Sequence, residues 1–519
     1  MRKQLSTSVY TFKTIINENG MYVDKTKELY QLVSKFNGQF FLSRPRRFGK
    51  SLTLSALESI FLGEKELFQG LYIYDKKFEW KKHPIIKLSL NKLSSITAEE
   101  LEENLAMELD FLSKDYEIAL SGRTAAQKFR ELIISLSRKF APVVILIDEY
   151  DKPILDNILN KEEVQKIRGF LKGFYGIIKA CEEYLRFTFI TGVSKFTQVS
   201  IFSDLNNLTD ITLNPDFATI CGFTQSECEH YFAEWIDENC IKLEMTKENY
   251  LAKLKETYNG IRFTEKNVLV YNPVSFTRAM DECNFKHHWF ETGTPTFLLK
   301  LLEEKDYDVV NFENLQLESS AFSSYDIDKL KLEALLYQTG YVTIKDYDPD
   351  STLYTLSYPN KEVRSSFVLY LADYFTFLGR EKYPSLVEQL RKAFLKNDID
   401  EVFEILRVFY AKIDNTIKLK QEKYYQTVFY IIFTLLGYRI KAEVNTNKGR
   451  MDAVIKTDSH LYIFEFKLDK PASKALEQIK KRDYYEKYLL DGRKLILIGV
   501  SFTSKTGEIK SWKMERLNQ

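Results

Sequence analysis

The chain of 519 residues is long enough for two to four domains, and its apolar share of 45% and charged share of 28% are those of an ordinary globular protein. The net charge of +1 indicates no particular partner, and the five cysteines form no C-x-x-C pair and do not cluster with histidines, which argues against a structural zinc site. No apolar run is as long as a membrane span and no signal segment follows Met1, so we expect a cytoplasmic protein without membrane contact.

The first 200 residues alternate helical patterns with short apolar strands. This alternation predicts a parallel sheet with helices on both faces. The run 143–147 is apolar throughout, as expected for a central strand that is buried on both sides. Strands are expected at 39–43, 85–90, 143–147 and 187–191, and helices at 25–36, 50–62, 98–112 and 125–140.

After residue 209 helical patterns dominate. The sequence Thr224-Gln-Ser-Glu227 is typical of a capping box at a helix start. Helical segments continue to about residue 279, a mixed stretch follows to about 368, and helices return between 370 and 439. The last portion predicts a compact α/β unit, with strands at 439–444, 451–456, 461–467 and 494–500 and a helix at 472–488.

The segment R44-P-R-R-F-G-K-S51 lies between a predicted strand and a predicted helix. In a phosphate-binding loop, backbone N–H groups surround the phosphates, the lysine reaches the outer phosphates and the hydroxyl binds Mg²⁺. Lys50 and Ser51 suit the last two roles, and a helix N-terminus favours an anion. Arg44 stands where such a loop usually opens with glycine. The residues expected to bind the nucleotide here are Arg46, Arg47, Phe48, Gly49, Lys50, Ser51 and Leu52.

An acidic pair, Asp148 and Glu149, ends the strand at 143–147. We expect Asp148 to hold Mg²⁺ and Glu149 to polarise the attacking water, although such a pair can also simply cap a strand. The next strand ends near Thr191 and Ser194, and either hydroxyl suits a group that senses the γ-phosphate. The alternative is a threonine that only caps its strand. Together with the Lys50 loop, the pattern predicts a site for ATP and Mg²⁺.

A second constellation lies near the end of the chain, at Asp452, Glu465 and Lys467. Glu465 and Lys467 are two residues apart and therefore share one face of their strand. If the two strands form a hairpin, both carboxylates and the lysine converge. Two carboxylates suit Mg²⁺ or Mn²⁺, which could activate water for phosphodiester cleavage. Taken alone, E-x-K on a strand is also common as surface alternation.

Many short motifs across nearly the whole chain resemble the bacterial AAA-ATPase-like proteins that carry a C-terminal PD-(D/E)XK nuclease-like domain. They are YVDKT (22–26), RPRRFGKS (44–51), LIDEYDKP (146–153), TGVSKF (191–196), IFSDLNNLTDIT (201–212), YNGIRF (258–263), YNPVSF (271–276), WFETGTPTFLLKLL (289–302) and LLYQTGYVTI (335–344). The spacing D-x(12)-E-x-K from Asp452 resembles the nuclease core itself.

The resemblance implies three domains: an AAA-like P-loop ATPase at 1–220, a helical lid and mixed connecting region at 221–369, and a restriction-endonuclease-like α/β domain with preceding helices at 370–519. It adds Gln478 as a catalytic residue, followed by Tyr485 on the same helix, and Glu422 as a metal ligand. Gln426 stands where a typical family helix has histidine, and no role is carried over to it. Glu443 is a further candidate contact. ATP binding is implied more securely than rapid hydrolysis.

The resemblance also implies nucleic acid as the partner, DNA in the first place, and leaves a homo-oligomer open. From residue 401 onward there are 23 Lys and Arg against 15 Asp and Glu, which suits a polyanion but also an ordinary lysine-rich surface. Arg46 and Arg47 would contact phosphate, form a surface bend or contact a DNA backbone. Two alternatives stay open: a nucleotide-dependent switch whose last domain binds nucleic acid or protein without cutting, and a nuclease for which the P-loop domain is only a platform.

Overall fold

The computed structural model divides into two compact units, which are described separately. The N-terminal unit comprises Met1–Leu301 and Asn314–Val363, and the C-terminal unit comprises Leu302–Glu313 and Arg364–Gln519. The structure describes residues 2–92, 97–195, 207–289, 312, 314–322, 332–413, 422–436, 439–446 and 449–517, without the side chains of 92, 320, 422–423, 439–446, 449–451 and 487. The three-domain division stays a prediction.

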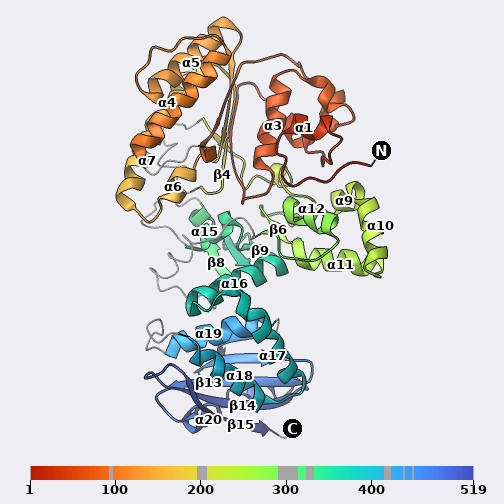
Figure 1. The fold of residues 1–519 in the computed structure, drawn as a ribbon, viewed down its shortest axis with the longest axis vertical. Coiled ribbons are helices and arrows are strands. Elements are labelled where there is room, and N and C mark those ends of the chain that lie inside the picture. The colour runs from red at the N-terminus through yellow and green to blue at the C-terminus, as the bar shows by residue number, and fades with distance from the viewer. Residues whose placement is uncertain are drawn as a thin grey trace. The chain divides into compact units, whose positions relative to one another are not determined.

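The N-terminal unit is built on a parallel five-stranded sheet in the order β2-β3-β4-β1-β5, which confirms the predicted α/β class (Figure 1). Strand β4 lies between β1 and β3, and its register pairs Leu42 with Thr191 and Ile147 with Ile190. The ends of all three strands therefore meet at one edge. The strands are β1 (Gly38–Ser43), β2 (Ile85–Ser89), β3 (Val143–Asp148), β4 (Leu185–Gly192) and β5 (Thr209–Asp210).

Helices cover both faces of this sheet, with α4, α5 and α7 on one side and α1 and α3 on the other (Figure 1). Capping boxes start α4 at Thr97 and α5 at Thr124, since each threonine hydroxyl accepts the N–H three residues on. Both strands β1 and β3 are buried along their whole length. The helices are α1 (Phe12–Asn17), α2 (Thr26–Val33), α3 (Lys50–Phe61), α4 (Ala98–Asp115), α5 (Ala125–Lys139), α6 (Lys152–Asp156) and α7 (Lys161–Ala180).

A helical region and a small sheet complete the N-terminal unit. The predicted capping box at Thr224 is confirmed at the start of α9. The helices are α9 (Gln225–Tyr231), α10 (Ala233–Lys242), α11 (Lys247–Tyr258), α12 (Pro273–Glu282), α14 (Ser319–Phe322) and α15 (Leu332–Thr339). The strands are the pair β6 (Ile261–Arg262) and β7 (Leu269–Val270), and a sheet in the order β8 (Leu315–Glu318), β10 (Leu353–Ser357), β9 (Thr343–Asp348).

The C-terminal unit is a five-stranded mixed sheet with helices on both faces (Figure 1). Its strands follow chain order: β11 (Arg439–Thr446), β12 (Gly449–Lys456), β13 (His460–Leu468), β14 (Lys494–Phe502) and β15 (Ile509–Leu517). The helices are α16 (Lys361–Thr376), which begins in the other unit, α17 (Tyr383–Leu395), α18 (Ile399–Ala411), α19 (Glu422–Leu435) and α20 (Ala472–Lys481).

Two expectations for this unit are wrong in detail. The helix expected over 472–488 ends at Lys481, so Tyr485 lies in a turn rather than on the helix with Gln478. Strand β15 was not expected, because its exposed side alternates charged residues without a continuous apolar run. Within the described part of the chain, no helix is both long enough and apolar enough to cross a membrane.

Candidate functional site

The loop Arg44–Gly49 joins β1 to α3 at the edge where the parallel strands end. Arg47 and Gly49 both have left-handed backbone angles, with φ of 65° and 91°. These angles turn the chain tightly enough for α3 to start at Lys50 with its N-terminus at the strand edge. The first amide groups of a helix have no partners within the helix, and they can bind an anion there.

Arg44 is a packing residue and not a surface group. Its side chain is 1% exposed, and its guanidinium donates to the carbonyl oxygens of Thr212 (2.8 Å) and Phe217 (3.0 Å). It also lies over the ring of Phe263, 4.1 Å from the centroid. Arg44 therefore ties the loop to the chain that follows β5.

Ser51 and Asp148 join the two motifs that the sequence places about a hundred residues apart. The Ser51 hydroxyl donates to Asp148 Oδ2 at 2.6 Å. The other carboxylate oxygen, Oδ1, is buried and has no hydrogen-bond partner among the described residues. A hydroxyl and a carboxylate in this arrangement offer hard oxygen donors to a cation such as Mg²⁺.

Lys50 lies at the same place but points back at its own loop. Its ammonium group donates to the carbonyl oxygens of Arg44 and Pro45, both at 3.0 Å. Burial lowers the pKa of this lysine, while the nearby carboxylates of Asp148 and Glu149 oppose that shift. The ammonium is therefore held beside the acidic pair, in reach of a phosphate bound at the loop.

Glu149 and Thr191 complete the group at the strand edge. Glu149 has a φ of 52°, an uncommon angle for a residue with a side chain, which is typical of functional sites. Burial raises the pKa of its carboxyl, the charges of Asp148 and Asp151 raise it further, and Lys50 lowers it. The Thr191 hydroxyl is buried and has no hydrogen-bond partner among the described residues, whereas the Ser194 hydroxyl donates to Asp151.

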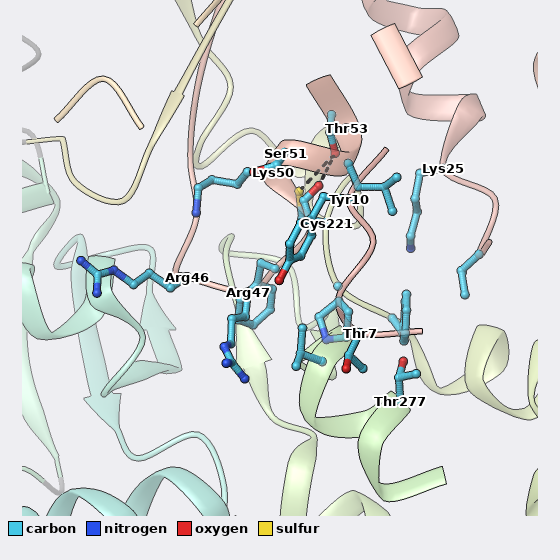
Figure 2. A pocket seen from close by; sticks show the side chains of 18 of the residues that line it. Thr7, Tyr10, Lys25, Arg46, Arg47, Lys50, Ser51, Thr53, Cys221 and Thr277 are labelled. Carbon is cyan, nitrogen blue, oxygen red and sulfur yellow. Dashed lines mark hydrogen bonds between the residues drawn. The ribbon is translucent and has the colours of Figure 1, made fainter. Parts of the chain in front are cut away.

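A cavity of about 590 Å³ opens beside these residues, within the N-terminal unit (Figure 2). This volume lies in the range of small-molecule sites. Lys25 lies in its wall and is paired with Glu227 of α9 at 2.6 Å, which links the start of α2 to the helical region. The wall includes Thr7 and Tyr10 near the N-terminus, Arg46–Gly49 of the loop and Lys50–Thr53 of α3, Glu149, Cys221 and Gly222, and Pro273, Val274 and Thr277 of α12.

Arg46 and Arg47 diverge from the loop (Figure 2). Arg46 is exposed at the cavity, and its charge lowers the pKa of Glu149. Arg47 is half-buried and donates to the carbonyl oxygen of His288 at 3.4 Å. The two arginines therefore have different surroundings, and a contact of either with phosphate stays a prediction.

In the C-terminal unit, Asp452 and Glu465 come together on a hairpin. Strands β12 and β13 pair Ala453 with Phe464, so the next residues along, Asp452 and Glu465, lie opposite each other. Asp452 Oδ2 accepts the N–H of Phe466 at 2.7 Å. The alternation along β13 sends the rings of Phe464 and Phe466 to Phe429 of α19, which leaves Glu465 and Lys467 on the opposite face.

Lys467 and Gln478 both bind Glu465. The lysine ammonium donates to Glu465 Oε1 at 3.0 Å and to the carbonyl oxygen of Phe466 at 2.8 Å, and Gln478 Nε2 donates to the same carboxylate oxygen. Glu465 is 1% exposed, so a buried carboxylate is here surrounded by donors from two elements. The structure thus brings together four of the residues expected at this site.

Gly499 explains how α20 reaches this position. It lies opposite Glu465 on β14, and a Cβ atom there would be 2.3 Å from the carbonyl oxygen of Ala472 and 2.7 Å from the N atom of Leu476. Helix α20 therefore rests directly on the backbone of the sheet. Only glycine permits this approach, which holds Gln478 over Glu465.

Two other expected residues lie partly outside the description. The backbone of Glu422 begins α19 and that of Glu443 lies in β11, but their side chains are not among the described residues. Among the side chains that are described, no three His, Cys, Asp or Glu residues are grouped as a metal site. The Asp452–Glu465 pair supplies two carboxylates, which fit a hard divalent cation.

Sequence reasoning missed Asp151 and the packing role of Arg44. Both stand inside motifs that the sequence displays, L146-I-D-E-Y-D151 and R44-P-R-R47. The signal for Asp151 was a third acidic residue directly after a buried strand. Arg44 had no such signal, because an arginine that donates only to backbone carbonyls has no partner in the sequence pattern.

Two family models match the chain. The model described as predicted AAA-ATPase matches residues 6–202, and the model of the PD-(D/E)XK nuclease superfamily matches residues 420–512. The chain belongs to the AAA-ATPase-like proteins that carry a C-terminal PD-(D/E)XK nuclease superfamily domain, as the motifs indicated.

The match to a curated relative extends along the whole chain. The chain is 34% identical over 533 residues to a protein of Azotobacter chroococcum mcd 1, described as an uncharacterized protein in the vnfD 5′ region, and the alignment covers 99% of both chains. No solved structure matches the chain. The alignment thus spans the residues that both family models match in this chain.

Proposed function

We propose that the N-terminal unit binds ATP with Mg²⁺ and hydrolyses it, and that the C-terminal unit is a metal-dependent nuclease that acts on nucleic acid, DNA in the first place. The observation that carries the nucleotide site is the bond from Ser51 to Asp148, since it joins the loop and the acidic pair into one group. The cavity beside them has room for the rest of a nucleotide.

In this proposal each residue at the strand edge has a separate role in binding or hydrolysis. The amides from Phe48 to Leu52 surround the phosphates, and Lys50 exchanges its loop carbonyls for phosphate oxygens. Ser51 and Asp148 would hold Mg²⁺, which supplies charge neutralisation for the phosphates. Glu149 orients and polarises the attacking water.

In the C-terminal unit, Asp452 and Glu465 would hold a divalent cation, with Glu422 as a further ligand. The metal supplies activation of water and stabilisation of charge on the phosphate. Lys467 acts beside the carboxylates, and Gln478 holds the Glu465 carboxylate in place. The excess of lysine and arginine from residue 401 onward supports an anionic substrate.

The test combines binding and cleavage on the full chain. Calorimetry with ATP and Mg²⁺ should show binding by the wild type and an affinity about ten- to a hundredfold lower for Lys50→Ala, because a charge-assisted phosphate contact is lost. Plasmid, linear and single-stranded DNA are incubated with and without ATP and with Mg²⁺ or Mn²⁺. Equal ATP binding by both proteins would overturn the nucleotide site.

Absence of cleavage on every DNA and on RNA, with either metal, would overturn the nuclease and leave the nucleotide-dependent switch. If the protein binds no ATP and still cleaves DNA, the nuclease proposal stands, and the N-terminal unit is then only a platform for it.

A further inference from the structure

Asp151 is a buried carboxylate that the roles above do not use. It follows β3 by three residues and is 0% exposed. Although it holds the N-cap position of α6, it makes no side-chain bond to that helix. Burying a carboxylate is unfavourable unless donors surround it, so its partners must lie elsewhere.

Among the described residues, the hydrogen-bond donors that other residues offer to its carboxylate come from the segment that follows β4. The two carboxylate oxygens accept the N–H of Val193 at 3.2 and 3.1 Å, and Oδ2 also accepts the N–H and the hydroxyl of Ser194, each at 2.6 Å. One side chain from the loop after β3 thus holds the backbone of the neighbouring loop at two consecutive residues.

Tyr150 adds to this connection. Its N–H donates to the carbonyl oxygen of Thr191 at 3.1 Å, and its hydroxyl donates to that of Ser194 at 2.8 Å. Between them, a Cβ atom on Gly192 would be 2.5 Å from both Asp151 Oδ1 and Tyr150 Cδ1. The close approach explains the glycine in T191-G-V-S194, since any side chain there would push the two loops apart.

The same segment is bonded to the loop that carries Lys50. The Ser43 hydroxyl donates to the carbonyl oxygen of Val193 at 2.5 Å, and the N–H of Arg44 donates to that of Gly192 at 3.1 Å. The end of β4 therefore stands between the two halves of the nucleotide site and is attached to each. At its centre is the Thr191 hydroxyl, which is buried and has no hydrogen-bond partner among the described residues.

We propose that Asp151 is a positioning residue: it holds Thr191–Ser194 in register with Asp148 and Glu149, so that the Thr191 hydroxyl distinguishes a nucleoside triphosphate from a diphosphate. This inference rests on the proposed nucleotide function. Asp151 acts through this segment and not directly, because its carboxylate is fully buried and bonded to Val193 and Ser194. Thr191 follows Ile190, the register partner of Ile147, and therefore lies beside Asp148. Among the described residues of the segment, Val193 lines the cavity, whereas Thr191 lies behind its wall with a fully buried side chain.

Glu131 offers a control for the loss of a carboxylate with the same kinds of donors, away from the cavity and less buried than Asp151. Its carboxylate accepts the N–H of Ser121 at 2.8 Å, the hydroxyl of Ser121 at 2.9 Å and the N–H of Gly122 at 2.9 Å. It therefore has the same kinds of donors as Asp151, two backbone amides and a serine hydroxyl. It lies on α5 and is not among the described residues that line the cavity.

The experiment measures the dissociation constants of ATP and ADP, each with Mg²⁺, for the full-length wild type, Asp151→Asn, Thr191→Val and Glu131→Gln. Asp151→Asn should lower the preference for ATP over ADP at least about fivefold and leave ADP affinity within about twofold, because only the γ-phosphate contact is displaced. Thr191→Val should give a similar loss, and the double variant should lose little more, since both act on one contact. Glu131→Gln should keep the wild-type preference.

The outcomes separate the inference from the function on which it rests. A wild type that binds neither nucleotide overturns the proposed function and the inference with it. If the wild type prefers ATP and Asp151→Asn keeps that preference, the inference alone is overturned. A wild type that binds ATP and ADP equally well overturns the inference too. If Asp151→Asn does not fold, Ser194→Ala removes one donor and leaves both amides, and an unchanged preference in that variant contradicts the inference.

Discussion

The two candidate sites both place a carboxylate pair beside a lysine, but they assemble these groups in different ways. The first collects Lys50, Asp148 and Thr191 from three strand ends that are far apart in the chain. The second takes Asp452, Glu465 and Lys467 from one hairpin. A site of the first kind depends on the folding of the whole unit, whereas one of the second kind is largely a local structure.

The lysines differ as well. Lys50 donates to backbone carbonyls of its own loop, so its side chain must move to meet a ligand. Lys467 donates directly to Glu465 and is already placed beside the carboxylate pair. We therefore expect substitutions at the first site to separate binding from turnover, and those at the second to act on cleavage while leaving nucleic-acid binding in place.

The largest expected effect is at the hairpin. Asp452→Asn or Glu465→Gln should reduce DNA cleavage at least about a hundredfold, because one remaining carboxylate cannot hold the metal in a useful geometry. A gel-shift titration should show DNA binding retained in both. Asp458→Asn, an exposed aspartate in the turn of the same hairpin, is the matched control and should cleave like the wild type. Full cleavage activity in Asp452→Asn would contradict the assignment of Asp452 as a metal ligand at the second site.

At the first site, Glu149→Gln should slow ATP hydrolysis by about ten- to a hundredfold while ATP affinity stays within about threefold, since the amide keeps its size but cannot polarise water. Steady-state phosphate release and calorimetry measure the two quantities. Equal turnover in wild type and variant would show that Glu149 does not act on the water. The first site would then be supported only by its binding of ATP.

The close packing of α20 on the sheet provides a test of whether the second site depends on more than its hairpin. Gly499→Ala should lower stability by about 1–3 kcal/mol, because the added methyl group meets the backbone of Ala472 and Leu476. Cleavage should fall together with stability as Gln478 is moved from Glu465. Gly173→Ala in α7, where a Cβ meets nothing within 4 Å, should instead be neutral or slightly stabilising. Thermal unfolding and cleavage assays of both variants check this.

The smallest effect concerns the pH dependence of the N-terminal unit. Burial raises the pKa of Glu362 to about 7, although the N–H groups of His288 and Trp289 and the charge of Arg47 lower it. Because the folded pKa lies above the ordinary value, this carboxyl contributes stability that is fully present below about pH 4.5 and is lost as the pH rises through 7. The loss should be about 1–3 kcal/mol.

Glu362→Gln should remove that dependence and keep the two backbone bonds, which go to a single oxygen, Oε1. Urea unfolding at pH 5.5 and pH 8 measures it. A wild type whose N-terminal unit unfolds at the same urea concentration at both pH values would contradict the assignment. The unfolding of the C-terminal unit serves as the internal reference.

The sequence predicted the elements of both sites closely because their apolar patterns are strong. The strands at 143–147 and 187–191 lie within β3 and β4, and the helix expected from residue 50 is α3. The error at 472–488 arose because the apolar spacing continues past Lys481 into Tyr484 and Tyr488, which pack under the sheet from a turn and a short 3₁₀ helix.

The chain alone determined which groups could do chemistry: the G-K-S triplet, the acidic pair, and D-x(12)-E-x-K, since these depend on residue type and short spacing. Only the tertiary structure decided how they meet. It placed β4 between β1 and β3, buried Arg44 among backbone carbonyls and directed Asp151 to the neighbouring loop. Strand order and the burial of a charged group follow from packing across distant segments, and no local pattern in the chain encodes them.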